Sequence, residues 1–580
     1  MGGGQARPAS ITRNQKGKNQ TMSRNTSALQ KARDAYRPKL PKALRADRVA
    51  VKLGAPTEPA THKEDIKKLF PNTYGQPEVK MVALRQAQDD GSLGSAPPKV
   101  GVVLSGGQAP GGHNVIAGLF DALKAANPQS RLFGFLKGPG GVIKGKHKEL
   151  TAEIIDGYRN TGGFDMIMSG RDKIEKPEDL AACKANFAEM GLDGLVVIGG
   201  DDSNTNAAVL AEYLRAEGSK TCIIGVPKTI DGDMKNEPIE ASFGFDTASK
   251  LYSELIGNIC RDATSAVKYW HFIRLMGRSA SHVTLECALQ THPNIALISE
   301  EVQQKGSTLK EVVDYIADIV MRRSQAGKDY GILIVPEGLP EFIPEIKALI
   351  DELSEILGTD EDYIHDLPDH SERVQHLNTK LSDHSARVYG FLPVEAQEVL
   401  LKRDSHGNVP LSQVETERLL IDRVSDKFRA MEGRGEEAPK FSPLAHFFGY
   451  EGRCAPPSNF DADYCYSLGF AAAQLVRAGL TGYTANVQNM TRPSEEWVAG
   501  GTPVTMMLNI ENRKGKAVPV IRKALVDLDG APFRQFAANR DQWAIEDCYV
   551  FPGPIQYFGP PEVCDAPTMT LGLEKGEGAR

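Results

Sequence analysis

Five short apolar runs, each followed by a polar or glycine-rich loop, constrain the fold of this 580-residue chain most. The runs cover residues 100–104, 192–198, 221–226, 271–275 and 330–335. Segments with helical character separate them, for example at 113–126 and 204–216. Strands that alternate with helices predict an α/β fold with a mainly parallel sheet covered on both faces. Ligands of such sheets bind beyond the carboxyl ends of the strands, so these loops form the candidate site.

Composition excludes several other classes of protein. A hydrophobic content of 41% and a charged content of 25% are typical of a globular chain. The net charge of −7 gives no basic field, so no nucleic-acid partner is expected. The eight cysteines form no CxxC pair, which favours a reducing, cytoplasmic location. No apolar run reaches about 18 residues, so no membrane span is expected.

The two regions outside the strand pattern differ from each other. Residues 1–50 hold 12 Lys or Arg against two acids, which predicts a disordered basic tail. An organelle transit peptide is the alternative, although no amphipathic face is evident. Residues 338–440 have amphipathic helical spacing and dense charge, which predicts a helical insertion with a structural or interface role.

The loop PKTIDGD, at residues 227–233, follows the third run and gathers two carboxylates and a lysine. For a phosphoryl transfer, Asp231 is the candidate general base and Asp233 a supporting carboxylate. Lys228 can offset charge on the transferred group, since unit charges about 4 Å apart attract by roughly 4 kcal/mol near a protein surface. The alternative is an ordinary Asp-Gly surface turn.

The loop GGDDSN, at residues 199–204, ends the second run and places Asp201 beside Asp202. Mg²⁺ bound to phosphate oxygens uses one or two carboxylates, and Asp201 is the candidate ligand. An ordinary helix N-cap from Asp202 or Ser203 is the alternative. A cap needs only one such side chain, so the second carboxylate remains to be explained.

Four further loops follow the same logic. The glycine loop at 105–112 opens a helix and can admit a phosphate. Arg278 in MGR and Arg453 in YEGR can clamp phosphates, and Glu337 in PEG can accept sugar hydroxyls. Residues 140–146 match the start of a P-loop, but His147 stands where Ser or Thr is required, which predicts a plain loop.

The motifs of this chain resemble those of the phosphofructokinase family over about residues 99–560. They are, in order along the chain, GGDDS, PKTIDGD, MGR, PEG and YEGR. The chain is similar to the long, pyrophosphate-dependent type, close to the catalytic β chains of plants. ATP-dependent bacterial members usually have glycine at positions 202 and 228. The resemblance implies that Asp202 fills the space of a nucleotide α-phosphate and that Lys228 steadies pyrophosphate.

The resemblance also implies an activity: reversible, Mg²⁺-dependent transfer of phosphoryl from pyrophosphate to fructose 6-phosphate, giving fructose 1,6-bisphosphate and phosphate. It implies donor contacts at Gly106 and Arg171, Mg²⁺ at Asp201 and the base at Asp231. Lys268 and Tyr269 lie where the family brings residues across from a neighbouring subunit. Substrate contacts are implied for Thr229, Ile230, Asp233, Met276, Gly277, Arg278, Glu337, Tyr450, Glu451, Gly452 and Arg453.

The implied fold has two similar Rossmann-like three-layer domains that face each other across a cleft. An N-terminal extension at 51–98 precedes a donor and Mg²⁺ domain at 99–265. A sugar-phosphate domain follows at 266–560, with a C-terminal tail at 561–580. The implied partner is a second copy or a regulatory α-like subunit. Two rivals remain: an ATP-dependent phosphofructokinase, and a non-catalytic regulatory subunit that keeps the fold.

Overall fold

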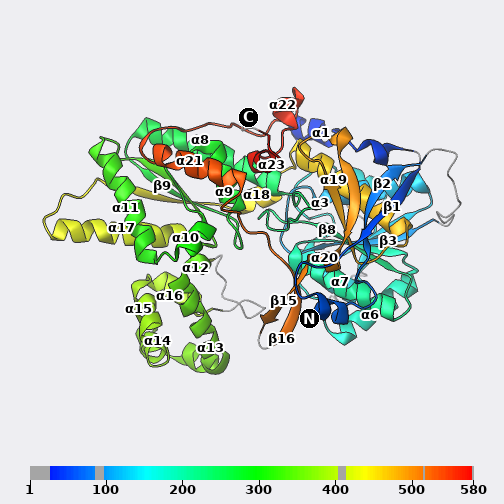
Figure 1. Cartoon of the computed structure of the whole chain (residues 1–580), viewed down its shortest axis with the longest axis horizontal. Helices are drawn as coiled ribbons and strands as arrows, with labels where there is room; N and C mark the ends of the chain where they lie inside the picture. The colour runs from blue at the N-terminus through cyan, green and yellow to red at the C-terminus, as the bar shows by residue number, and fades with distance from the viewer. Residues whose placement is uncertain (1–26, 47, 85–96, 403–412, 514–515, 578–580) are drawn as a thin grey trace, which may run out of the picture.

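The computed structural model describes residues 27–46, 48–84, 97–402, 413–513 and 516–577, and contains two main β-sheets (Figure 1). The larger sheet has ten strands, with β6 (Ser169–Gly170) paired to β3. The other nine lie in the order β1 (Val49–Pro56), β2 (Pro77–Ala83), β14 (Val498–Pro503), β13 (Tyr483–Gln488), β8 (Cys222–Pro227), β7 (Gly194–Gly199), β3 (Lys99–Ser105), β4 (Arg131–Phe135) and β5 (His147–Glu149).

The centre of this first sheet is parallel, as the sequence predicts. Strands β4, β3, β7, β8 and β13 run parallel to one another, while β1, β2, β14 and β5 pair antiparallel at the two edges. The carboxyl ends of β3, β7 and β8 therefore lie together at one edge of the sheet.

Alternate side chains of the central strands enter two different cores. Val102 and Val196 pack with α3 (Gly112–Ala126) and α19 (Asn459–Arg477) on one face. Val103 and Val197 pack with α6 (Pro177–Met190) and α7 (Asp201–Ala216) on the other. Strands buried on both faces carry continuous apolar runs, which is why these strands are visible in the sequence.

The second sheet has four parallel strands, in the order β10 (Ile295–Ala296), β11 (Gly331–Pro336), β9 (Trp270–Leu275) and β12 (Pro443–Phe448). One face packs on α8 (Phe245–Ala266) and α9 (His282–Thr291), through Ile273 and Ile334. The opposite face, through Phe272 and Leu333, packs on α11 (Leu309–Gln325) and α17 (Thr416–Gly433). Both sheets are thus the middle of three layers.

The predicted helical insertion is confirmed in the part that the structure describes. Besides α17, the helices of this insertion form a lobe at the lower left of Figure 1. They are α12 (Leu339–Phe342), α13 (Pro344–Asp366), α14 (His370–Asn378), α15 (Asp383–Phe391) and α16 (Val394–Leu400). No helix in the described ranges is both long and apolar enough to cross a membrane.

The remaining elements connect or flank the two sheets. They are α1 (Ala28–Asp34), η1 (Lys42–Arg45), α2 (Lys63–Leu69), α4 (Pro139–Ile143), α5 (Ala152–Asp156), α10 (Ser299–Lys305), α18 (Tyr450–Cys454), η4 (Ser494–Glu496), α20 (Val504–Met507), the hairpin of β15 (Leu508–Arg513) and β16 (Lys516–Ile521), α21 (Ala531–Ile545), α22 (Pro561–Cys564) and α23 (Met569–Glu574).

The predicted domain boundaries need correction. Strands β13 and β14 fall within the predicted domain at 266–560, but they complete the first sheet. Helix α19 packs on α3 and leads the chain back to this sheet, where β13 pairs with β8. Strands β1 and β2 of the predicted extension join the same sheet beside β14. The two sheets therefore share the C-terminal part of the chain.

Both predicted tails are folded where the structure describes them. Arg33 in α1 is buried and donates to Asn459 Oδ1 and Pro457 O, each at 2.7 Å. The predicted disordered tail was therefore wrong for residues 27–46, and residues 1–26 lie outside the described ranges. At the other end, the carboxylate of Glu286 accepts the backbone N–H groups of Met569 and Thr570, which fixes the start of α23.

Candidate active site

The loop after β8 is held in place by backbone and hydroxyl contacts. Lys228 N donates to Gly199 O at 3.0 Å, which joins the ends of β8 and β7. Asp231 N donates to Thr229 Oγ1 at 3.1 Å. Gly232 has φ of 74°, a left-handed conformation that favours glycine. The turn thus brings the two aspartates of DGD back toward the strand ends.

Lys228 supplies the positive charge of this loop and is buried, with 6% of its surface exposed. Its Nζ donates to Gly107 O at 2.6 Å, so it reaches the glycine loop after β3. Burial, together with the nearby guanidinium of Arg453, lowers the pKa of Lys228 to about 8, although Asp231 and Asp201 act in the opposite direction. A buried ammonium beside a glycine loop is a strong attractor for a small anion.

Asp201 and Asp202 occupy the first turn of α7, where the helix dipole favours carboxylates. The N-cap residue is Gly200, which has no side chain to cap the helix. Ser203 Oγ donates instead to Ser105 Oγ at 2.8 Å, toward β3. The alternative of an N-cap supplied by Asp202 or Ser203 is therefore wrong.

The residues around Asp201 fit a magnesium ion that is held mainly by a phosphate ligand. Burial, with Asp231 and Asp201 close by, raises the pKa of Asp233 to about 7, so negative charge is concentrated here. Among the residues that the structure describes, no group of three or more His, Cys, Asp or Glu side chains is arranged to hold a metal. A single carboxylate suits Mg²⁺ that takes its other ligands from phosphate oxygens and water.

The loops of the second sheet supply the opposite wall of the site. Gly277 has φ of 127°, which lets the chain turn sharply between β9 and Arg278. A Cβ at Gly338 would overlap Arg278 O, so the PEG loop needs glycine for this close approach. The strands β9 and β11 are neighbours, and their ends place Glu337 next to Arg278.

Glu337 is buried, with 8% of its surface exposed. Burial, together with the like charge of Asp231, raises the pKa of Glu337 to about 7, although Arg274 and Arg278 act against this. Within the described part of the chain, its Oε2 atom is buried without a hydrogen-bond partner. Such an acceptor is costly unless a ligand donates to it, and a sugar hydroxyl would do so.

YEGR forms α18, which carries Arg453 back to the first sheet. Tyr252 of α8 donates to Gly449 O at 2.6 Å, and a Cβ at Gly452 would overlap the Tyr252 ring. A Cβ at Gly107 would likewise overlap the Arg453 guanidinium. The contact with the Tyr252 ring explains why position 452 is glycine, whereas the long Arg453 side chain could move away from a Cβ at position 107. Tyr450 is 66% exposed on the same helix.

The other predicted residues fall into two groups. Arg171 is exposed and follows Gly170, whose carbonyl oxygen accepts Gly106 N at 2.9 Å, so it lies beside the glycine loop. Lys268 and Tyr269 precede β9, whereas Met276 follows it. The six residues of β9 span roughly 20 Å, so this chain does not bring Lys268 and Tyr269 into its own site.

Lys523 is a candidate site residue that the sequence did not reveal. Its Nζ lies 3.6 Å from Asp201 Oδ2 and donates to Ser279 Oγ at 2.6 Å. Burial opposes its charge, but Asp201 and Asp233 outweigh this effect and raise the pKa of Lys523. The residue follows β16, far from every motif in sequence, and no local pattern marks it.

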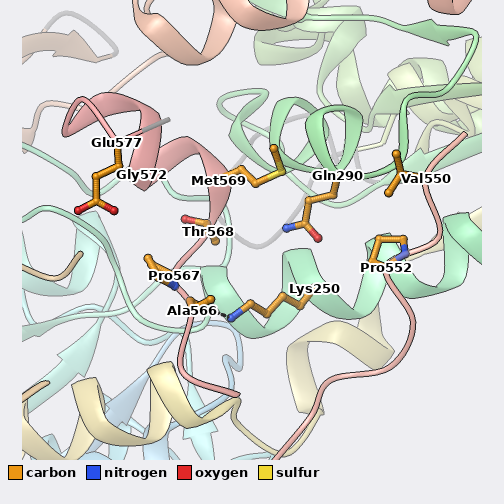
Figure 2. Close-up of a pocket in the computed structure, with 10 residues that line it drawn as sticks. All are labelled: Lys250, Gln290, Val550, Pro552, Ala566, Pro567, Thr568, Met569, Gly572 and Glu577. Atoms are coloured by element: carbon orange, nitrogen blue, oxygen red, sulfur yellow. Dashed lines mark hydrogen bonds between the residues drawn. The ribbon is translucent and has the colours of Figure 1, made fainter. Parts of the chain in front are cut away.

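A separate pocket of about 270 Å³ lies between α8, α9 and the C-terminal segment (Figure 2). Lys250 and Met569 are among its lining residues. The Lys250 ammonium already donates to Asp246 Oδ2 at 2.8 Å and to Ala566 O at 2.6 Å. Because this cation is paired and no motif residue lines the pocket, the pocket is distinct from the candidate active site.

Comparison with known proteins agrees with this geometry. Residues 99–376 match the phosphofructokinase family model. A pyrophosphate–fructose 6-phosphate 1-phosphotransferase of Porphyromonas gingivalis is 56% identical over 95% of this chain and 99% of its own length. The β 2 subunit of the Arabidopsis thaliana enzyme of that name is 51% identical, over 91% of this chain and 90% of its own length.

A crystal structure of a pyrophosphate-dependent phosphofructokinase from Marinobacter aquaeolei has a TM-score of 0.50 and 13% identity, over 78% of this chain and 93% of that one. This match concerns the fold alone, and it confirms the predicted α/β architecture. The sequence matches extend over nearly the whole of both chains. The chain therefore belongs to the phosphofructokinase family, among the pyrophosphate–fructose 6-phosphate 1-phosphotransferases.

Proposed function

We propose that this protein reversibly transfers a phosphoryl group from pyrophosphate to the 1-hydroxyl of fructose 6-phosphate, giving fructose 1,6-bisphosphate and phosphate. One observation carries the proposal: Lys228 is buried at the glycine loop of the first sheet, in the same turn as Asp231. The relatives that share nearly the full length of the chain have this activity in their names.

Asp231 serves as the general base that removes the proton of the 1-hydroxyl as the oxygen attacks phosphorus. Lys228 and Arg171 stabilise negative charge on the donor phosphates. Arg278 and Arg453 bind the sugar phosphate, and Glu337 accepts hydrogen bonds from sugar hydroxyls. The buried, unpartnered Oε2 of Glu337 supports this last role.

Mg²⁺ is the proposed cofactor, with Asp201 as its protein ligand. When bound, the ion would neutralise charge on the pyrophosphate oxygens. The first turn of α7 also holds Asp202, whose carboxylate disfavours a longer polyphosphate at this helix N-terminus. Asp202 and Lys228 together are therefore proposed to select pyrophosphate over ATP.

A second subunit is proposed to complete the site. Lys268 and Tyr269 lie at the far end of β9 from Arg278, which supports a role for them in the site of a neighbouring chain. The partner is a second copy or an α-like regulatory subunit, as the name of the Arabidopsis β subunit suggests. The reaction is assigned to the cytoplasm, in keeping with the eight cysteines, all of which are free thiols.

The decisive experiment compares two donors on the purified protein with Mg²⁺ and fructose 6-phosphate. Turnover with pyrophosphate and not with ATP is expected. Turnover with ATP alone would favour an ATP-dependent phosphofructokinase. Asp231→Asn should lower kcat by a factor of roughly 10³, because the general base is lost. A wild-type chain inactive with both donors would favour a regulatory subunit.

A further inference from the structure

Lys523 lies between the two halves of the candidate site. Its ammonium group is 3.6 Å from Asp201 Oδ2 and donates to Ser279 Oγ at 2.6 Å. Asp201 begins α7 on the first sheet, whereas Ser279 directly follows Arg278 after β9 of the second sheet. One lysine therefore contacts both the proposed metal carboxylate and the loop that binds the sugar phosphate.

The backbone around Lys523 is anchored to the catalytic parts of the molecule. Ala524 N donates to Asp233 O at 2.8 Å, within the DGD turn. Ala524 O accepts from His282 Nε2 at 2.9 Å, at the start of α9. The Lys523 side chain is 34% exposed, so it can turn while its backbone stays fixed.

The charges near Asp201 change when the donor binds. Mg²⁺ and an ammonium group attracted to the same carboxylate repel each other, whereas pyrophosphate brings several anionic oxygens. Lys228 Nζ is bound to Gly107 O and Arg453 lies against Gly107, whereas the Lys523 ammonium lies beside the Asp201 carboxylate. Lys523 is therefore placed to respond to this change of charge.

We propose that Lys523 neutralises Asp201 in the metal-free protein and turns to the pyrophosphate oxygens when Mg²⁺ and pyrophosphate bind. Lys523 then acts as a donor-binding residue supplied by the C-terminal segment. The inference rests on the proposed function, because it takes pyrophosphate as the donor. When the lysine is made neutral, we expect the metal ion to bind more tightly and pyrophosphate to bind more weakly.

The test uses the full-length protein with Lys523→Met. Mn²⁺, followed by electron paramagnetic resonance without pyrophosphate, should bind about threefold tighter, because the competing ammonium is gone. Pyrophosphate, titrated calorimetrically with Mg²⁺ and without sugar, should bind about tenfold more weakly. A merely structural role would weaken both, and that result, or no change in either, would overturn the proposal.

Two matched variants sharpen the test. Arg522→Met removes a neighbouring exposed cation and should leave both affinities within about twofold of the wild type. Lys523→Arg keeps the charge and should restore both affinities to within about 1.5-fold of the wild type. If Lys523→Met does not fold, Lys523→Gln serves as the neutral variant. A loss of both affinities in Lys523→Arg would also contradict the proposal.

The failure of this inference and that of the proposed function are distinguishable. The two-donor assay on the wild-type protein tests the function without any change at Lys523. The Mn²⁺ measurement tests the contact between Lys523 and Asp201 without any turnover. Wild-type activity with pyrophosphate, combined with unchanged affinities in Lys523→Met, would reject the lysine's role alone.

Discussion

At the residue scale, the buried position of Lys228 predicts that the use of pyrophosphate depends on pH. Burial, reinforced by Arg453, lowers the pKa of Lys228 to about 8, so its positive charge is present below that pH and lost above it. We expect kcat/KM for pyrophosphate to fall as the pH rises through about 8, since this ratio reports the groups of the free enzyme. A pH profile of initial rates measures this.

The control for this prediction is Lys228→Arg. The guanidinium stays charged, so the alkaline fall should move to higher pH even if the overall rate is lower. A wild-type profile that stays flat well into the alkaline range would show that the charge of Lys228 does not limit pyrophosphate use.

Asp202 gives a second prediction at this scale. Asp202→Gly should admit measurable turnover with ATP, because the side chain that fills the space of a nucleotide α-phosphate and repels a longer polyphosphate is removed. It should also weaken pyrophosphate use by roughly tenfold, because the enlarged site no longer fits the shorter donor. Steady-state kinetics with both donors measure the switch. Asp179→Gly, in the first turn of α6, is the matched control and should leave the donor preference unchanged. Unchanged kinetics in Asp202→Gly would refute the selective role of the aspartate.

At the scale of elements, a buried ion pair joins the helical insertion to the second sheet. Arg274 Nε of β9 lies 2.7 Å from Glu417 Oε2 of α17, and both side chains are at most 5% exposed. Burial raises the pKa of Glu417 although Arg274 acts against this, so desolvation is the larger effect. The pair therefore fixes the position of α17 on β9 more than it adds stability.

Removing one partner of this pair leaves an uncompensated buried charge. Glu417→Gln should lower the free energy of unfolding by roughly 3–5 kcal/mol, as measured by urea denaturation. The double variant Arg274→Met with Glu417→Leu should regain most of that loss. Lys310→Ala, in an exposed pair on α11, is the control and should leave the urea midpoint unchanged. Equal midpoints for Glu417→Gln and the control would contradict the prediction.

The strands after which the candidate site forms could be predicted to within two residues from the sequence. Strand β8 covers Cys222–Pro227 where 221–226 was predicted, and β9 covers Trp270–Leu275 where 271–275 was predicted. Each of these strands is buried on both faces, so its apolar run is continuous. The edge strands β1 and β2 carry exposed residues and weaker patterns, and the sequence did not show that they belong to the first sheet.

At the scale of the whole molecule, the position of Lys268 predicts shared active sites. Lys268→Ala and Asp231→Asn should each be nearly inactive, because each removes a different chain's contribution to one site. Coexpressed in a twofold assembly, they should recover about a quarter of the wild-type activity, since half of the dimers then hold one intact site. Activity assays on the copurified mixture measure the recovery.

The control mixture combines Asp231→Asn with Lys228→Met. Both changes affect the same chain's half of the site, since Lys228 and Asp231 share one turn, so no mixed dimer has an intact site. This mixture should stay inactive. Equal recovery in the two mixtures, or none in either, would show that Lys268 does not act across the interface.

The sequence by itself determined the parallel α/β architecture, the loops after β3, β7, β8, β9 and β11, and the residues within them, because these depend on patterns only a few residues long. The tertiary structure alone decided that β13 and β14 complete the first sheet and that Arg33 is buried beneath the C-terminal half. It also decided that Lys523 reaches Asp201. Contacts between segments hundreds of residues apart depend on how the layers pack, and no local pattern encodes them.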